Sequence, residues 1–193
     1  MLFCADDLSV EYVPQFFNEK KSDFFLNTFT SSIDWRGDKI KIYGKTHPLP
    51  RLTAFFGDLD ISYSYSGITM NPLPWTKELL EIKSKIEYYT GNYFNSVLLN
   101  RYRDGCDYHG FHSDNETSLG NTINIASVSL GSVRDFKFKT RDNLHKRSFT
   151  VPLAHGSLLL MNHPTQISWL HSLPKRLKVK NERINLTFRY INK

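Results

Sequence analysis

The tripeptide His112-Ser113-Asp114 is the strongest candidate for a metal site in this sequence. In a strand, residues two apart point to the same face, so the imidazole and the carboxylate would lie side by side. A third ligand must come from elsewhere, and His163 and His171 are the candidates. Two histidines and one carboxylate leave open positions on the metal, as in non-haem Fe(II) oxygenases. Taken alone, such a tripeptide is more often an ordinary surface or core pair.

Two arginines near the C-terminus could bind a carboxylate. Arg183 and Arg189 follow His171 in a segment, 184–191, that alternates between apolar and polar residues. If this segment is a strand, both arginines share one face and the apolar side chains share the other. Buried arginines are costly unless a carboxylate meets them, and a guanidinium can hold a dicarboxylate through two parallel hydrogen bonds. The alternative is a pair of solvated arginines on an edge strand.

Alternating apolar residues in the second half of the chain predict about eight short strands. We expect them at residues 96–103, 108–114, 122–130, 134–140, 148–153, 157–162, 167–172 and 184–191. Asn100 and Tyr102 share one face of the first strand, where they either line the same pocket or pack beneath the sheet. Because no helical crossover separates the strands, a parallel sheet is disfavoured and a double-sheet jelly roll is favoured.

The first half of the chain carries the helical patterns. A helix is predicted within residues 14–30 by four phenylalanines at the spacing of one helix face, Phe17, Phe24, Phe25 and Phe29. Apolar residues between Trp75 and Tyr89 predict a second helix over 75–90, ended by Gly91. Residues 39–70 show strands and turns instead. The fold class expected is therefore α+β and mainly β.

Composition bounds the class of protein. The chain has 193 residues, no internal repeat, and a net charge of +6 that suits a polyanion partner or simply aids solubility. Two cysteines are too few for a disulfide scaffold, and no apolar run approaches a membrane span. The acidic first 13 residues do not resemble a signal peptide. We expect one intracellular domain that does not enter a membrane.

Several blocks in register resemble the AlkB family of Fe(II)- and 2-oxoglutarate-dependent dioxygenases, especially the nuclear human homologues that repair alkylated DNA. The blocks are residues 99–107, 112–114, 125–131 with 134–136, 153–159, 161–165, 171–174 and 183–189. The resemblance runs from about residue 39 to 190. It implies a double-stranded β-helix (jelly roll) with N-terminal helices and a DNA-contacting hairpin. Residues 1–193 would form a single domain, with a nucleotide-recognition extension over about 1–90 and the catalytic core over about 91–193.

The resemblance also implies the ligands of the cofactors. Fe(II) would be held by His112, Asp114 and His171, which sets His163 aside. Arg183 would bind the far carboxylate of 2-oxoglutarate, and O₂ would be the second co-substrate. The rest of the keto-acid pocket would be lined by Asn100, Tyr102 and Arg189.

A pocket for a flipped base is implied as well. Tyr65 and His112 would stack on the base, and Glu116 would read its exocyclic amine. The full set of residues carried over is Arg51, Tyr63, Tyr65, Ser66 and Glu116. A finger that wedges into the duplex would consist of Ile42, Tyr43 and Gly44. From chemistry alone, an ordinary amphipathic hairpin is the alternative for this segment.

The activity implied is oxidative dealkylation of DNA bases such as N1-methyladenine and N3-methylcytosine, with release of succinate, CO₂ and formaldehyde. Alkylated DNA would be the partner, duplex more than single-stranded, and the protein would act as a monomer. It would work in the nucleus of a eukaryote or the cytoplasm of a bacterium. Two alternatives stay open: the same chemistry on RNA or a protein side chain, and a non-catalytic jelly-roll module that binds nucleic acid.

Overall fold

The computed structural model describes residues 1–42, 45–61, 63–65, 68–142, 144 and 146–192. Tyr43, Gly44 and Ser66, which the sequence placed in the finger and the base pocket, lie outside these ranges. The remaining predicted site residues lie within them.

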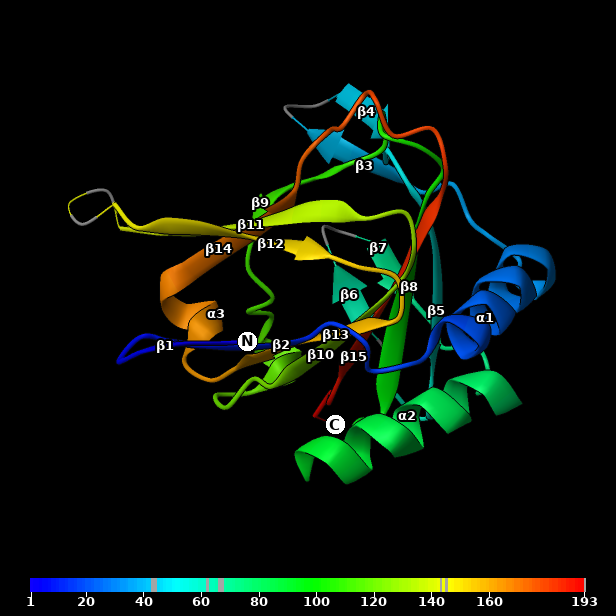
Figure 1. The fold of residues 1–193 in the computed structure, drawn as a ribbon, viewed down its shortest axis with the longest axis horizontal. Coiled ribbons are helices and arrows are strands. Elements are labelled where there is room, and N and C mark those ends of the chain that lie inside the picture. Colours follow the sequence, from blue (N-terminus) through cyan, green and yellow to red (C-terminus); the bar gives the residue numbers. More distant parts are fainter. Residues whose placement is uncertain (43–44, 62, 66–67, 143, 145, 193) are drawn as a thin grey trace.

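The larger of two main sheets has seven antiparallel strands (Figure 1). In spatial order they are β1 (Leu2–Ala5), β2 (Leu8–Val13), β13 (Ser157–Asn162), β10 (Ile125–Gly131), β15 (Arg183–Arg189), β8 (Ser96–Tyr102) and β5 (Leu52–Gly57). β15 is therefore a central strand, paired on both sides. The edge-strand alternative for its arginines is wrong.

The smaller main sheet has four antiparallel strands and faces the larger one. Its order is β12 (Ser148–Leu153), β11 (Arg134–Thr140), β14 (Trp169–Leu173) and β9 (His109–His112). Two separate hairpins pair β3 (Lys39–Ile42) with β4 (Lys45–Pro48) and β6 (Tyr63–Tyr65) with β7 (Ile68–Met70). The two facing sheets confirm the predicted jelly roll, and all eight strands expected after residue 90 are present.

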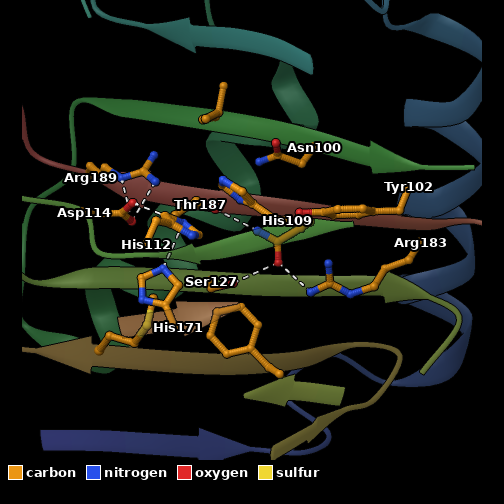
Figure 2. A pocket seen from close by; sticks show the side chains of 14 residues that line it. Asn100, Tyr102, His109, His112, Asp114, Ser127, His171, Arg183, Thr187 and Arg189 are labelled. Atoms are coloured by element: carbon orange, nitrogen blue, oxygen red, sulfur yellow. Dashed lines mark hydrogen bonds and ion pairs between the residues drawn. The ribbon is translucent and has the colours of Figure 1, made fainter. Parts of the chain in front are cut away.

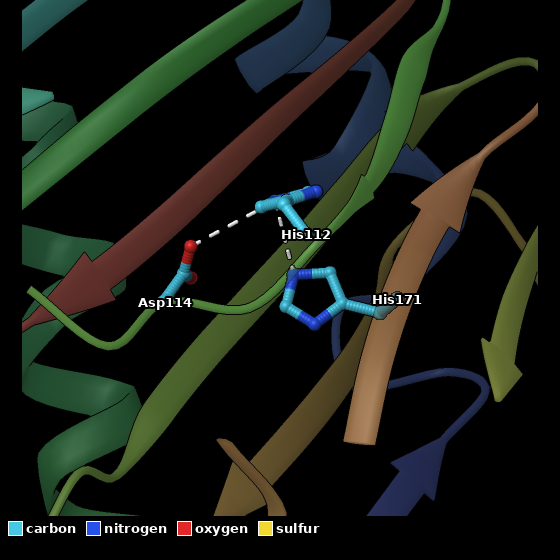
Figure 3. Close-up of side chains that lie close together, drawn as sticks. All are labelled: His112, Asp114 and His171. Carbon is cyan, nitrogen blue, oxygen red and sulfur yellow. Dashed lines mark hydrogen bonds and ion pairs between the residues drawn. The ribbon is translucent and has the colours of Figure 1, made fainter. Parts of the chain in front are cut away.

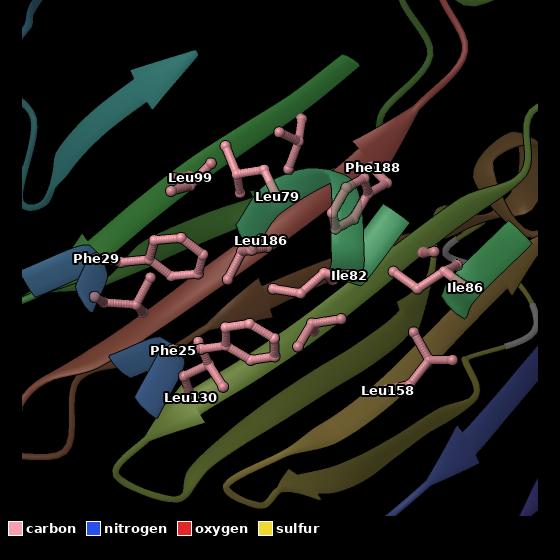
Figure 4. Close-up of a cluster of buried hydrophobic side chains, with 14 of the residues drawn as sticks. Phe25, Phe29, Leu79, Ile82, Ile86, Leu99, Leu130, Leu158, Leu186 and Phe188 are labelled. Atoms are coloured by element: carbon pink, nitrogen blue, oxygen red, sulfur yellow. The ribbon is translucent and has the colours of Figure 1, made fainter. Parts of the chain in front are cut away.

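Two helices cover the outer face of the larger sheet. They are α1 (Glu19–Ser32) and α2 (Lys77–Thr90), which ends at Gly91 with a φ of 68°, a conformation that favours glycine. The apolar faces of the helices pack on the outward side chains of β8, β10, β13 and β15, as Figure 4 shows. Ile184, Leu186 and Phe188 of β15 lie in this core, so the other residues of β15 must face the smaller sheet.

A second apolar cluster fills one end of the space between the sheets. It joins Val10 and Leu159 of the larger sheet to Phe138, Val151 and Trp169 from the smaller sheet. Beside this cluster lies the pocket described below, most of whose lining residues are polar. The space between the sheets is thus apolar at one end and mostly polar at the pocket, and it is separate from the apolar core under the helices.

Three features of the fold differ from the sequence expectations. Residues 1–13 form an unpredicted hairpin whose second strand, β2, pairs with β13. A short helix, α3 (Thr165–Ser168), replaces the start of the strand expected at 167–172. Phe24 is 48% exposed, so it does not belong to the buried face of α1. The β2–β13 pairing joins segments about 150 positions apart in the chain.

Candidate metal centre and its pocket

His112, Asp114 and His171 converge between the two sheets (Figure 3). His112 ends β9 and faces His171 across the β9–β14 pair. Their Nε2 atoms are 3.1 Å apart, and His112 Nε2 lies 3.7 Å from Asp114 Oδ1. Within the described ranges, these three residues form the group of His, Cys, Asp or Glu side chains that could hold one metal ion. His163 is exposed in the turn before α3 and does not join them.

The surroundings of the two imidazoles favour their neutral forms. Burial, together with the neighbouring His112, lowers the pKa of His171 to about 3. Burial also lowers the pKa of His112. His112 Nδ1 lies 2.9 Å from the carbonyl oxygen of Gly110, which can only accept, so Nδ1 carries the proton. The lone pair of His112 Nε2 is therefore free to face the cluster.

The carboxylate of Asp114 is ionised and held on two sides. Burial alone would raise its pKa, but the nearby Arg189 and the two imidazoles keep the pKa well below its usual range. The guanidinium of Arg189 donates to Asp114 Oδ2 at 2.8 and 3.3 Å. The backbone N–H of Asp114 donates to the side-chain Oε1 of Gln166, a buried residue of α3. Asp114 lies beyond the end of β9, so these contacts, rather than the predicted strand, position it.

These three side chains fit a divalent metal ion. Two imidazole nitrogens and one carboxylate oxygen converge on one point, and all three can present lone pairs to a shared cation. Two nitrogens bound to one metal at about 2.1 Å and at a right angle lie about 3.0 Å apart. The observed Nε2–Nε2 distance of 3.1 Å matches this spacing. The donor set is the two-histidine, one-carboxylate arrangement of non-haem iron sites.

Arg183 lies at the opposite end of the same pocket from Asp114 and Arg189 (Figure 2). It is 1% exposed and donates to Ser129 Oγ and Asn185 Oδ1 at 2.8 and 2.7 Å. Its Nε has no hydrogen-bond partner, and the described residues offer it no carboxylate. Burial lowers its pKa to about 10. The pocket therefore contains one arginine paired with an acid and one buried cation suited to an anion from outside.

Asn100 and Tyr102 line the pocket between these two ends. The guanidinium of Arg183 lies 5.5 Å from the centre of the Tyr102 ring. Asn100 Oδ1 accepts a 2.8 Å hydrogen bond from Arg51 Nε. Arg51, one of the residues expected in the base pocket, is only 2% exposed.

The sequence reasoning missed His109, which also lines the pocket. Its ring is stacked on that of His112, with centroids 3.7 Å apart. In a regular strand, residues three apart point to opposite faces, so strand alternation excluded this contact. The pairing of β9 with β14 is irregular at this point, and Gly110 between the two histidines was the available signal.

The other predicted base-pocket residues are spread over two segments. Tyr63 and Tyr65 lie in β6, and Ser66 follows it outside the described residues. Glu116 is half-buried, just before the 3₁₀ turn Thr117–Leu119. Of the finger, Ile42 ends β3, whereas Tyr43 and Gly44 lie outside the described residues. The described strands β3 and β4 pair with each other.

Two facing sheets around a two-histidine, one-carboxylate cluster define the class of jelly-roll non-haem iron oxygenases. The family model of the 2OG-Fe(II) oxygenase superfamily matches residues 9–189. Together with the relatives described next, this match shows that the chain belongs to that superfamily and, within it, to the AlkB family. Membership implies Fe(II), 2-oxoglutarate and O₂.

Similar proteins support this assignment. The chain is 47% identical to human DNA oxidative demethylase ALKBH2 over 179 residues, which cover 90% of this chain and 66% of the human protein. It is 41% identical to the mouse protein of the same name, covering 97% of this chain and 82% of that protein. The solved structure of OsALKBH1 matches with a TM-score of 0.67 and 16% identity, covering 97% of this chain and 99% of that one, which supports the fold. No helix in the described part of the chain is long and apolar enough to cross a membrane.

Proposed function

We propose that this protein is a DNA oxidative demethylase that removes N-alkyl groups from bases such as N1-methyladenine and N3-methylcytosine. The observation that carries the proposal is the pairing, in one buried pocket, of the His112–Asp114–His171 cluster with the unpaired cation of Arg183. A metal site and an anion site in one pocket are what an iron enzyme with a dicarboxylic co-substrate requires. The names of the ALKBH2 relatives suggest DNA as the substrate.

In this proposal His112, Asp114 and His171 hold Fe(II), and Arg183 binds the far carboxylate of 2-oxoglutarate. Bound iron, with 2-oxoglutarate and O₂, supplies the oxidation of the N-alkyl carbon, and succinate, CO₂ and an aldehyde (formaldehyde from a methyl group) are released. The protein orients the reactants and keeps the pocket dry. Arg189 keeps Asp114 ionised and aimed at the metal. The sides of the keto-acid pocket are Asn100, Tyr102 and Arg189.

The base pocket is proposed to consist of Arg51, Tyr63, Tyr65, Ser66 and Glu116. N1-methyladenine and N3-methylcytosine are cationic, so aromatic faces and a carboxylate favour them over undamaged bases. Glu116 would accept from the exocyclic amine, while Tyr65 and His112 would stack on the ring. His109 already covers one face of His112, which leaves the other parts of that ring for the base.

DNA binding is proposed to involve the β3–β4 hairpin and two exposed basic segments. Ile42, Tyr43 and Gly44 would form the wedge that enters the duplex. The basic residues are Lys137, Lys139, Arg141, Lys146 and Arg147 around the β11–β12 hairpin, and Lys175, Arg176, Lys178 and Lys180 after β14. Contacts to phosphates would make the affinity fall steeply with salt.

We also propose a monomer that acts on duplex DNA in the nucleus. Residues 1–193 would act as one domain, in which about 1–90 form the recognition lid and about 91–193 the catalytic core. Support comes from the ALKBH2 relatives, which are named as DNA enzymes in mammals. A Tyr43→Ala variant tests the strand preference, because loss of a wedge should slow duplex substrate more than single-stranded substrate. Equal slowing of both would remove the proposed wedge.

The central experiment measures succinate and repaired base with iron, 2-oxoglutarate and a methylated DNA duplex. Methylated single-stranded RNA and a protein extract are the comparison substrates. His112→Ala and Asp114→Ala should abolish turnover and leave DNA affinity nearly unchanged. Turnover only on RNA or protein would favour the alternative enzyme. DNA binding by a wild-type protein without iron-dependent turnover of 2-oxoglutarate would favour the non-catalytic module.

A further inference from the structure

Strand β9 contains an irregularity beside the metal cluster. His171 of β14 pairs with His112, and Leu173 pairs with His109, so two steps along β14 correspond to three along β9. An extra residue of this kind is a β-bulge, which turns neighbouring side chains away from the regular alternation. As a result, His109 and His112 both line the pocket. Phe111, between them, is 45% exposed.

The bulge gives His112 two contacts of different kinds. The Gly110 carbonyl oxygen accepts from His112 Nδ1 at 2.9 Å, and the His109 ring stacks on the His112 ring with an angle of 22° between their planes. The χ2 torsion of a histidine has broad minima, so one hydrogen bond leaves the tilt of the ring poorly defined. A parallel ring at 3.7 Å restricts that tilt. Together the two contacts define both the direction of Nε2 and the plane of the imidazole.

His109 is itself held by a contact with Arg51. One of its ring nitrogens, Nε2, lies 3.3 Å from Nη2 of Arg51. Arg51 is buried and also donates to Asn100 Oδ1. Because a guanidinium only donates, His109 Nε2 accepts in this contact. A chain of contacts therefore runs from Asn100 of β8 through Arg51 to His109 and ends on His112.

The second histidine of the cluster has a comparable support. The ring of Phe136, on β11, is stacked on His171 with centroids 5.2 Å apart and 27° between the planes. Phe136 has no ring nitrogen, so ring stacking is what the contact of Phe136 with His171 shares with the contact of His109 with His112. This parallel favours ring packing as the contribution of His109.

We propose that His109 is a positioning residue for His112, which it holds by ring stacking in the orientation that binds the metal. The proposal rests on the proposed iron site and adds a residue to it. Groups that orient a ligand typically change metal affinity by about 10- to 100-fold when they are removed. The effect should therefore appear in metal binding itself, before any turnover.

The test is titration of the metal-free full-length chain with Co²⁺, followed by calorimetry and by the visible spectrum of the bound ion. His109→Ala should weaken Co²⁺ binding by about 10- to 100-fold and change the spectrum. His109→Phe keeps a ring without the nitrogens and should weaken Co²⁺ binding by less than about 10-fold, the lower end of the loss expected for His109→Ala. Phe111→Ala is the matched control on the same bulge and should bind Co²⁺ like wild type. Thermal unfolding of each metal-free variant checks that the chain is folded.

Two results would overturn the proposal. Wild-type affinity in His109→Ala would show that stacking is unnecessary, and equal losses in His109→Ala and His109→Phe would assign the effect to the ring nitrogens. Failure of the proposed function looks different. A wild-type protein that binds Co²⁺ but does not demethylate DNA would refute the activity, while the pattern of the His109 variants would still decide the positioning role.

Discussion

Replacing Arg183 by methionine tests whether this buried cation anchors the far carboxylate of 2-oxoglutarate. The side chain is 1% exposed, and its Nε has no hydrogen-bond partner in the part of the chain that the structure describes. Its two donated hydrogen bonds go to neutral oxygens, those of Ser129 and Asn185. Methionine has a similar length and no charge, so Arg183→Met removes the cation without leaving a large cavity.

The magnitude follows from the cost of burying the guanidinium. Burial lowers the pKa of Arg183 from its usual range to about 10, which corresponds to about 3 kcal/mol of unfavourable free energy for the charged form. A carboxylate opposite Arg183 recovers free energy of this order. We therefore expect the dissociation constant for 2-oxoglutarate to rise by about 100-fold in Arg183→Met. The free energy of unfolding of the unliganded protein should change little or increase, because an unpaired buried charge is removed.

The assay compares two keto acids in a double-mutant-cycle design. Wild type and Arg183→Met are titrated anaerobically with 2-oxoglutarate and with 2-oxobutyrate, which lacks the far carboxylate. The variant should lose affinity for 2-oxoglutarate only, and both proteins should bind 2-oxobutyrate equally weakly. If both keto acids lose affinity to the same extent, Arg183 does not recognise the far carboxylate. A large loss of stability without ligand would contradict the energetic argument.

Three further predictions concern the scaffold. Gln166→Leu should lower the free energy of unfolding by about 1–3 kcal/mol, since the buried N–H of Asp114 loses its acceptor. Urea denaturation measures this change, and an unchanged value would mean that another group accepts from the N–H. Leu186→Ala in the helix-covered core should lower the free energy of unfolding by about 2–5 kcal/mol in the same assay. The exposed control Leu177→Ala should lower it by about 0.5 kcal/mol or less, and equal losses would contradict the assigned core. Gly105→Ala should loosen the segment after β14, because a Cβ at position 105 would collide with the backbone of residue 176. Hydrogen exchange of the backbone amides of residues 174–182 should then increase. Unchanged exchange would refute the close approach of the two backbones.

Local patterns predicted much of this molecule. Alternation in the second half of the chain marked eight strands, and those strands are present, since a period of two directly reports a half-buried sheet. The same alternation put Arg183 and Arg189 on one face of a strand, and both line the pocket. The spacing of His112 and Asp114 suggested a metal site, and His171 does lie beside them. The roles of these residues rest on the experiments above.

Other features depended on register and on long-range pairing. Residues 8–13 alternate as the later strands do, but they pair with β13, about 150 positions away, and no local signal identifies a partner at that distance. His109 reaches the pocket only because of the bulge in β9. A strand pattern assumes regular register, so one extra residue reverses the expected face.

The sequence by itself determined the types of group available to the site: two histidines, one carboxylate and two arginines on strands with one polar face. Only the tertiary structure decided which of these charged groups are paired with each other. Arg189 is paired with Asp114, whereas Arg183, six residues earlier on the same face, has no acid partner among the described residues. The two arginines look equivalent in the sequence because local spacing carries no information about which buried charge is neutralised. That depends on which side chains the folded sheets bring within a few ångströms of each other.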